Sequence, residues 1–295
     1  MYSYKIWQWV LFFFIYCFIG WLWETAYVSS KSGQFENRGF MNGPFLPIYG
    51  SGAIVMLFVS LPVSKYPILV FVFGMTAATL LELATGIAME SLFHVRYWDY
   101  SYRKIQYKGH ICLVSSIAWG VFSCVLVYGL HKPIEKMVLS APSAICEAFT
   151  FVLTAINVFD FVTSFKAALE LKNMLITADD IKKQIDRLER RAEIVEVFMM
   201  DSAEKSKEDF REHISDIIEK ISESKEEAAL ELAKIRAERD ERLVVFRNRI
   251  NENKAISNLL RRNPDAISRR YDEALSIYKK QFINNVKENI FNKEK

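Results

Sequence analysis

Long runs of hydrophobic positions fill the first 165 residues, and short polar connections separate them. A helix that crosses a membrane needs about 20 mostly apolar residues, because its backbone polar groups must be paired within the helix. Runs of about that length are Ile6–Tyr27, Pro44–Leu61, Ile68–Met89, Ile111–Leu130 and Ala144–Phe165. The pattern therefore predicts an all-α fold, with a transmembrane helical bundle of about five spans over residues 1–165.

After residue 165 the pattern becomes that of a charged helix. Residues 166–295 contain no glycine or tryptophan. Apolar residues recur at steps of four and three from Ile181 to Met199, again from Phe210 to Ala228, and more loosely from Leu232 to Ile250, which is the seam of a coiled coil. Thr177 with Asp180 resembles the start of this helix. We expect the coiled coil over residues 166–262 either to break near Asp201–Ser202 and form a hairpin, or to pair in parallel with a second copy. Pro264 then begins a last amphipathic helix over residues 263–295.

Lysine and arginine in the connections indicate the orientation of the bundle. A cytoplasmic C-terminal region places six of them inside (Lys31, Arg38, Arg96, Arg103, Lys104 and Lys108) and four outside (Lys5, Lys65, Lys132 and Lys136). The first span is followed by no small-residue cleavage site, so we expect it to be retained as an anchor. The prediction is a multi-pass protein of the bacterial inner membrane with its N-terminus outside.

Ionisable residues within and beside the spans are the candidates for function. Such groups are costly in a bilayer and usually face the bundle interior or water. In the predicted topology, a polar site in the cytoplasmic half is built from Glu24, Arg38, Glu82, Arg96 and Asp99. Glu82 would pair with an arginine or bind a cation or a headgroup. The alternative is a set of structural ion pairs that lock the bundle.

The sequence carries no signature of an enzyme. It has no phosphate-binding loop of the G-x-x-x-x-G-K-[ST] type, no H-E-x-x-H, no G-x-S-x-G and no Cys/His cluster. The four cysteines lie in apolar spans without CxxC spacing, which is typical of small apolar fillers. We therefore expect no catalysis, cofactor or metal. No specific nucleic-acid binding is expected either, because the basic residues lack interleaved aromatics.

Several short stretches together resemble one family of bacterial membrane proteins. They are Gly20–Glu24, Asn37–Phe40, Gly43–Gly50, Trp98–Tyr100 and Gly109–Leu113. The family is described as putative ABC-transporter type IV, or putative ABC transporter permease, and the resemblance covers about residues 5–165. It implies an inner-membrane bundle with a transport role. The C-terminal coiled coil lies outside the resemblance.

Two functions follow from these observations. The first is a permease-like subunit that uses the polar site and draws energy from a separate ATPase, since the chain has no phosphate-binding loop of its own. The second is a membrane-anchored scaffold, in which the bundle is an anchor and the coiled coil binds a partner. The apolar seam of the tail must be buried in either case, by self-association or by a hairpin.

Overall fold

The computed structural model describes residues 4–208, 229–230, 232–238, 240–241, 244, 254–276 and 279. Its elements are α1 (Ile6–Ser32), α2 (Pro47–Ser60), the 3-10 turn η1 (Leu61–Val63), α3 (Pro67–Phe93), β1 (Gln106–Tyr107), β2 (Ile111–Cys112), α4 (Leu113–Val125), the π-helical turn η2 (Leu126–Leu130), α5 (His131–Ser140), α6 (Ser143–Glu208) and α8 (Lys254–Arg262). Apart from the two-stranded antiparallel hairpin β1–β2, these elements are helical, as the sequence predicts.

Four helical stretches among the described residues are long and apolar enough to cross a membrane. They are Ile6–Ser32, Pro67–Phe93, Leu113–Ser140 and Ser143–Ile194. The second predicted span, Pro44–Leu61, is helical only from Pro47 onward. Proline has no backbone N–H and fits the first turn of a helix, so Pro47 marks the point where α2 begins.

An irregular segment, Gly39–Leu46, precedes α2 and packs within the protein. The Leu46 N–H donates to the carbonyl oxygen of Cys17 at 3.1 Å, and Cys17 lies near the middle of α1. Gly39 has a φ of +118°, and a Cβ there would lie 2.4 Å from Leu46 Cδ2. Glycine is therefore needed at this position for both its conformation and its size. The irregular segment lies beside α1, where Phe45 also packs on Phe14 and Phe18.

Helices α1 to α4 pack closely through small residues. A Cβ on Gly74 of α3 would lie 2.0 Å from Ser123 Oγ of α4. A Cβ on Gly20 of α1 would lie 2.4 Å from Tyr49 Cβ of α2. Small residues let helix backbones approach in this way, and such close packing drives helix association where no water is present to favour it.

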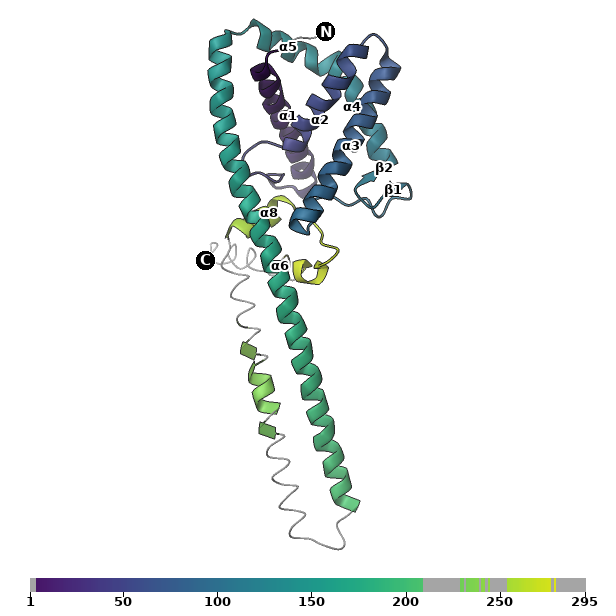
Figure 1. The fold of residues 1–295 in the computed structure, drawn as a ribbon, viewed down its shortest axis with the longest axis vertical. Coiled ribbons are helices and arrows are strands. Elements are labelled where there is room, and N and C mark those ends of the chain that lie inside the picture. Colours follow the sequence, from purple (N-terminus) through teal and green to yellow (C-terminus); the bar gives the residue numbers. More distant parts are fainter. Residues whose placement is uncertain are drawn as a thin grey trace.

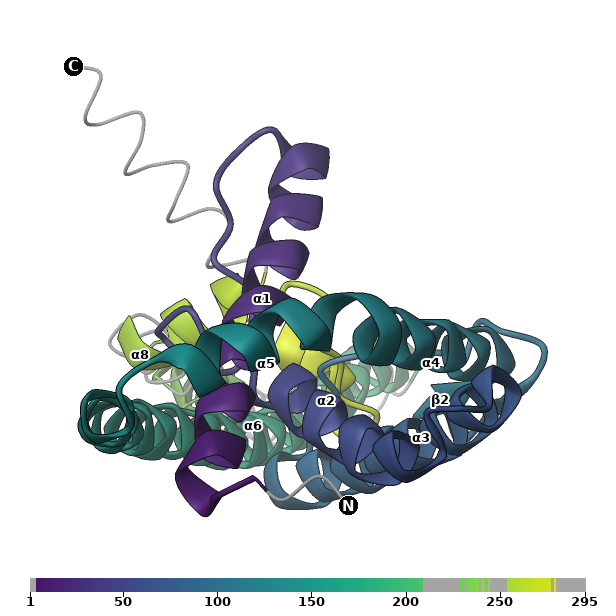
Figure 2. The same ribbon diagram turned by 90° about the horizontal axis from the view of Figure 1, so that it is seen from above.

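Helix α5 closes one end of the bundle and lies across it between α4 and α6 (Figure 2). Its first residue, His131, is buried and has Nδ1 2.7 Å from the hydroxyl oxygen of Tyr16. The hydroxyl of Tyr4 lies 3.1 Å from His131 Nε2. The start of α1 and the whole of α5 therefore share one end of the molecule, opposite to the end from which α6 extends (Figure 1).

Helix α6 runs without a break from the bundle far beyond it (Figure 1). The predicted helix start at Thr177 is wrong, because Thr177 lies inside α6 and its hydroxyl donates to the carbonyl of Asn173. The break expected near Asp201–Ser202 is also absent, since α6 continues to Glu208. No glycine or proline interrupts the chain between Ser143 and Glu208, which explains the continuity. The predicted division at residue 165 falls inside this helix and stays a prediction.

The chain after residue 254 returns to the base of the bundle. Helix α8 packs on α6, and apolar residues of both join one core, namely Ala168, Leu171, Leu175, Ile256 and Leu259; Leu275, from the helical stretch 272–276, joins it too. The helix predicted to begin at Pro264 is wrong over residues 264–271, which are irregular; helix resumes at Asp272–Ser276. Within this stretch the backbone of Ile267 exchanges hydrogen bonds with Arg96 of the bundle, which replace helical bonds at that residue.

Parts of the predicted coiled-coil seam lie outside the described residues, namely Phe210 to Ala228 and Leu243, Phe246 and Ile250. Within the described part, Leu188 of α6 is buried, and so are Leu232 and Ile235 in the helical stretch 232–238. Burial of these seam residues fits the apolar pattern. The coiled coil as a whole stays a prediction.

Candidate functional site

A cavity of about 380 Å³ lies at the end of the bundle opposite α5. Residues of α1, α2, α3, α4 and α6, of the irregular segment and of the C-terminal stretch line it. Glu24, Arg38 and Glu82 are its ionisable residues, and aromatic and aliphatic side chains make most of the remaining wall. Three of the five predicted site residues are therefore brought to one cavity.

Glu82 is buried in the cavity wall and is held by three neutral donors. The Tyr100 hydroxyl donates to its Oε1 at 3.1 Å. Trp119 Nε1 at 3.0 Å and the Ser115 hydroxyl at 3.3 Å donate to its Oε2. Among the described residues Glu82 forms no ion pair, so of the alternatives for Glu82 the pairing with an arginine finds no support there, and the binding of a cation or a headgroup stays a prediction. Hydrogen bonds to a buried carboxylate offset part of the cost of removing it from water.

Glu24 and Arg38 lie together at the mouth of the cavity. The Tyr49 hydroxyl donates to Glu24 Oε2 at 2.7 Å. Arg38 Nη2 is 3.9 Å from Glu24 Oε1 and 3.1 Å from Asp265 Oδ2, so the nearer carboxylate comes from the C-terminal stretch. The Arg38 side chain is only 11% exposed. One guanidinium nitrogen thus links the connection between α1 and α2 to Glu24 of α1 and to Asp265 near the C-terminus.

Arg96 and Asp99 form a separate cluster beside the cavity. Arg96 donates to Glu90 at 2.7 Å, to Asp99 at 3.1 Å and to the carbonyl of Lys108 at 2.8 Å. His110 Nε2 lies 3.1 Å from the same oxygen of Glu90. Neither Arg96 nor Asp99 lines the cavity. Their arrangement fits the alternative of structural ion pairs, and a binding role for them stays a prediction.

Charge and burial in this cluster set its protonation states. Burial lowers the pKa of Arg96, but the hydrogen bond and charge of Glu90 outweigh it, so the pKa is raised overall. Burial, and then the charge of Arg96, lower the pKa of His110. His110 is therefore neutral near pH 7 and donates to Glu90 as an uncharged imidazole.

Residues at the end of α8 and in the C-terminal stretch 263–276 complete the cavity mouth, and the sequence did not predict them. Asn263 lines the cavity, and its side-chain amide donates to the carbonyl of Gly39 at 3.1 Å. Arg262 donates to the Asn42 side chain and, at 3.3 Å, to the carbonyl of Phe40. These pairs are more than 200 positions apart, and no periodic pattern in the sequence connects them.

Asp160 of α6 holds the irregular segment in place. Its carboxylate accepts the backbone N–H of Asn42 at 3.1 Å and that of Gly43 at 2.7 Å. The Ser164 hydroxyl lies 3.4 Å from the same carboxylate. The sequence marks Asp160 as an ionisable residue at a span, and the structure shows that it satisfies backbone donors that no helix pairs.

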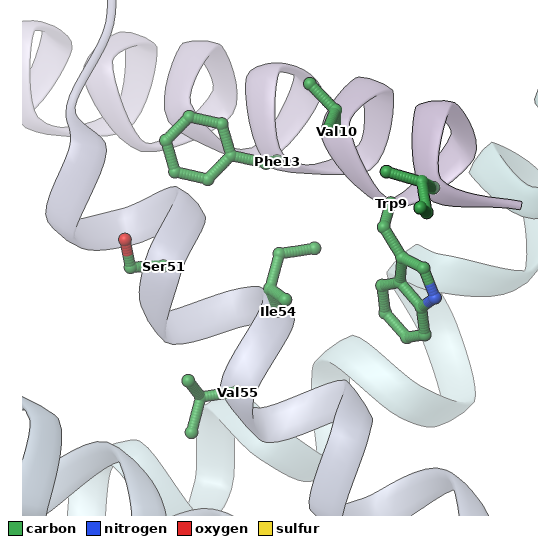
Figure 3. Close-up of a pocket in the computed structure, with 7 residues that line it drawn as sticks. Trp9, Val10, Phe13, Ser51, Ile54 and Val55 are labelled. Carbon is green, nitrogen blue, oxygen red and sulfur yellow. The ribbon is translucent and has the colours of Figure 1, made fainter. Parts of the chain in front are cut away.

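A second hollow, of about 420 Å³, lies between the first turns of α1 and the middle of α2 (Figure 3). Trp9, Val10 and Phe13 face Ile54 and Val55 across it, and Ser51 is its polar residue. It contains no ionisable group, so it offers no counterpart to the polar cavity. Within the described part of the chain, no group of three or more His, Cys, Asp or Glu residues could hold a metal ion.

Comparison with known proteins finds one family. The sequence model of the family described as "Putative ABC-transporter type IV" matches residues 11–165. The matched region contains all five predicted site residues, whereas α8 and the stretch 263–276 lie beyond it. No curated protein matches the chain, and no solved structure does.

Proposed function

The chain belongs to the putative ABC-transporter type IV family, and on this premise we propose that it is a permease-like membrane subunit. Its solute site is the cavity that contains Glu24, Arg38 and Glu82. The observation that carries the proposal is Glu82: a carboxylate 4% exposed, facing a cavity rather than closed off by a cation. An ionisable group kept at such a place inside a membrane bundle is a functional candidate by default.

The proposal includes five crossings of the bilayer. Helix α2 with η1 is too short to span alone, and the irregular segment before it, which packs on α1, extends this crossing. Non-helical backbone is tolerated at membrane depth when it is buried in protein. Here the Asp160 carboxylate and the Cys17 carbonyl accept hydrogen bonds from backbone N–H groups of this segment. The N-terminus then lies outside, and α6 enters the cytoplasm of a bacterial cell.

Single cysteines test this topology in a variant that lacks the four native ones. Lys183, exposed on α6 beyond the bundle, and Lys65, in the connection between α2 and α3, are the positions to replace. A membrane-impermeant thiol reagent should label Lys65→Cys in intact cells and Lys183→Cys only after lysis. Labelling of Lys183→Cys in intact cells overturns the proposed orientation.

Energy for transport would come from a separate ATPase, because the sequence has no phosphate-binding loop. Co-purification of the full chain from native membranes tests this directly. Recovery with a nucleotide-hydrolysing partner supports the permease proposal, and repeated recovery without one counts against it.

The site itself is tested with Glu82→Gln in that co-purified complex, reconstituted in nanodiscs. The amide keeps the size of the side chain but removes the charge. We therefore expect the rate of ATP hydrolysis by the complex to change relative to the unsubstituted protein, because the state of the bundle would no longer control it normally. Glu147→Gln is the matched control, since Glu147 is exposed near the first turn of α6. Equal effects of the two substitutions would reject Glu82 as the site.

A scaffold function is the second candidate, and the length of α6 favours it, because this helix carries a partly buried apolar seam far beyond the bundle. We propose that the tail folds back on its own chain, supported by the ion pair between Lys182 and Glu273 and by the packing of α8 on α6.

Leu188→Asp should abolish a scaffold function, while Arg187→Asp, on an exposed neighbour, should not. Tolerance of Leu188→Asp together with sensitivity to Glu82→Gln rejects the scaffold.

A further inference from the structure

The polar cavity has an excess of unpaired hydrogen-bond donors. Arg38 Nη1 and the Tyr97 hydroxyl are buried without a partner among the described residues, and both residues line the cavity. Arg262 Nε is a third such atom, and the charge of Arg262 acts on the Tyr97 hydroxyl. A buried donor left unpaired is costly, and native structures contain few of them. Three within one region call for a ligand that accepts hydrogen bonds.

Each carboxylate nearby already accepts at least one hydrogen bond. Glu82 accepts three donors, Glu24 accepts the Tyr49 hydroxyl, and Asp160 accepts two backbone N–H groups. Asp265 engages Nη2 of Arg38 and leaves Nη1 free. The unsatisfied groups are thus donors on a cation and a phenol. This asymmetry favours an oxygen-rich anionic group over a cation.

Apolar side chains of two spanning helices form another part of the cavity wall. Met89 and Leu92 of α3 and Phe161 and Phe165 of α6 line it. Leu92 is 45% and Phe161 is 43% exposed. Exposed apolar side chains on spanning helices face lipid tails, so we infer that the cavity wall meets the bilayer on this side. A chain that entered here would stay in an apolar environment along its length.

We propose that the cavity binds an amphiphile with an oxyanion headgroup, a carboxylate or a phosphate, placed between Arg38 and Tyr97, with its hydrocarbon chain against Leu92 and Phe161. A guanidinium is well suited to both oxyanions. A cavity of about 380 Å³ holds the headgroup and the first part of the chain, and the rest stays in the bilayer. This inference rests on the proposed function, for which it names the ligand class.

Two tryptophans in the cavity wall, Trp98 and Trp119, provide the measurement. The full chain is purified in phosphatidylcholine nanodiscs and titrated with dibromostearate, whose bromines quench indole fluorescence. We expect saturable quenching, displaced by unbrominated lysophosphatidate and not by inorganic phosphate. Dibromostearyl alcohol, which lacks the charge, should bind about tenfold more weakly.

Two variants test the headgroup position. Arg38→Gln and Tyr97→Phe should each weaken dibromostearate binding about tenfold, because each removes one donor to the oxyanion. Tyr97→Phe is the sharper of the two: it removes a hydroxyl that has no partner, so it should not lower the melting temperature. The matched controls are Arg269→Gln and Tyr102→Phe, on residues exposed at the same end of the molecule.

Three results overturn the inference. They are absence of saturable quenching, equal binding of the alcohol and the acid, and unchanged binding in both Arg38→Gln and Tyr97→Phe. Displacement of dibromostearate by inorganic phosphate but not by lysophosphatidate would also overturn it, because the site would then bind a free anion rather than an amphiphile. The assay needs no ATPase, so its outcome is independent of whether a nucleotide-hydrolysing partner is found.

Discussion

The backbones of Arg96 and Ile267 pair in an antiparallel bridge. The Arg96 N–H donates to the carbonyl of Ile267 at 2.7 Å, and the Ile267 N–H donates to the carbonyl of Arg96 at 2.9 Å. The connection after α3 is thereby joined to the C-terminal stretch, and Ser268 adds a bond from its hydroxyl to the carbonyl of His94 at 2.6 Å. The stretch that carries Asn263 is held at the cavity mouth by main-chain bonds, which depend little on side-chain identity.

Ile267→Pro should release this stretch. Proline removes the N–H that bonds to Arg96 and leaves a carbonyl unpaired, a local cost of about 1–3 kcal/mol. We expect faster trypsin cleavage after Arg269 and Arg270, measured on the purified protein in detergent. Ile267→Val keeps both backbone bonds and is the control. Equal cleavage rates in the two variants would show that the bridge does not hold the tail.

Arg96→Gln should destabilise the bundle strongly. Arg96 is 4% exposed and compensates Glu90 and Asp99. Removing one partner of a buried ion pair costs roughly 3 kcal/mol, and the partial exposure of Glu90 places the effect at or below that figure. Melting temperature in detergent is the measurement. Arg103→Gln, on an exposed arginine stacked on Tyr102, should change stability by about 0.5 kcal/mol or less.

Stability should fall in mildly acidic solution because of His110. Burial, and then Arg96, lower its pKa from the ordinary 6.5, so the folded state binds this proton more weakly than the unfolded chain. The contribution is complete above about pH 6.5 and is lost as the pH falls from there toward the lowered pKa. Glu90, Asp99 and Arg269 are the other charged groups acting on it.

The test compares melting temperatures between about pH 7.5 and pH 5.5, above the range in which ordinary carboxylates titrate. His110→Asn should flatten this dependence in part. His94 contributes with the same sign, since burial and then Lys172 lower its pKa, so the double variant should flatten it further. A pH dependence unchanged by both substitutions contradicts this assignment.

The bundle was predictable from the sequence because a membrane span has a simple requirement, a long apolar run. The same rule overestimated the helical part of the second span, where Pro44 and Pro47 leave the first residues without helical bonds. The prediction that a helix starts at Thr177 was wrong, because Thr177 lies inside α6 and a capping residue is only a local signal. An uninterrupted helical pattern around it was the better guide.

The candidate site was predictable only in part. The cost of a charge in a bilayer marks Glu82 as unusual. Its donors, however, lie 18 to 37 positions away, in the connection after α3 and on α4, and their approach depends on packing. Arg38 was expected near Glu24, whereas its closer partner, Asp265, is 227 positions away. Contacts of this kind follow from where the C-terminal stretch docks, which no periodicity expresses.

Two glycines of α2 give a matched test of how α1 and α2 pack. A Cβ on Gly50 would lie 2.3 Å from Cys17 Sγ and 2.7 Å from the backbone oxygen of Phe13, so α1 itself would have to move. A Cβ on Gly52, half a turn away, meets nothing within 4 Å. Gly50→Ala should therefore cost about 1–3 kcal/mol, as overpacking does.

Gly52→Ala should be neutral or stabilising by up to about 1 kcal/mol, since alanine favours the helix over glycine. Both variants are melted in the same detergent, so effects of the substitution on helix propensity cancel in the difference between them. A lower melting temperature for Gly50→Ala alone supports direct contact of the two backbones. Equal melting temperatures would mean that α1 and α2 are farther apart than the contact of Gly50 with Phe13 requires.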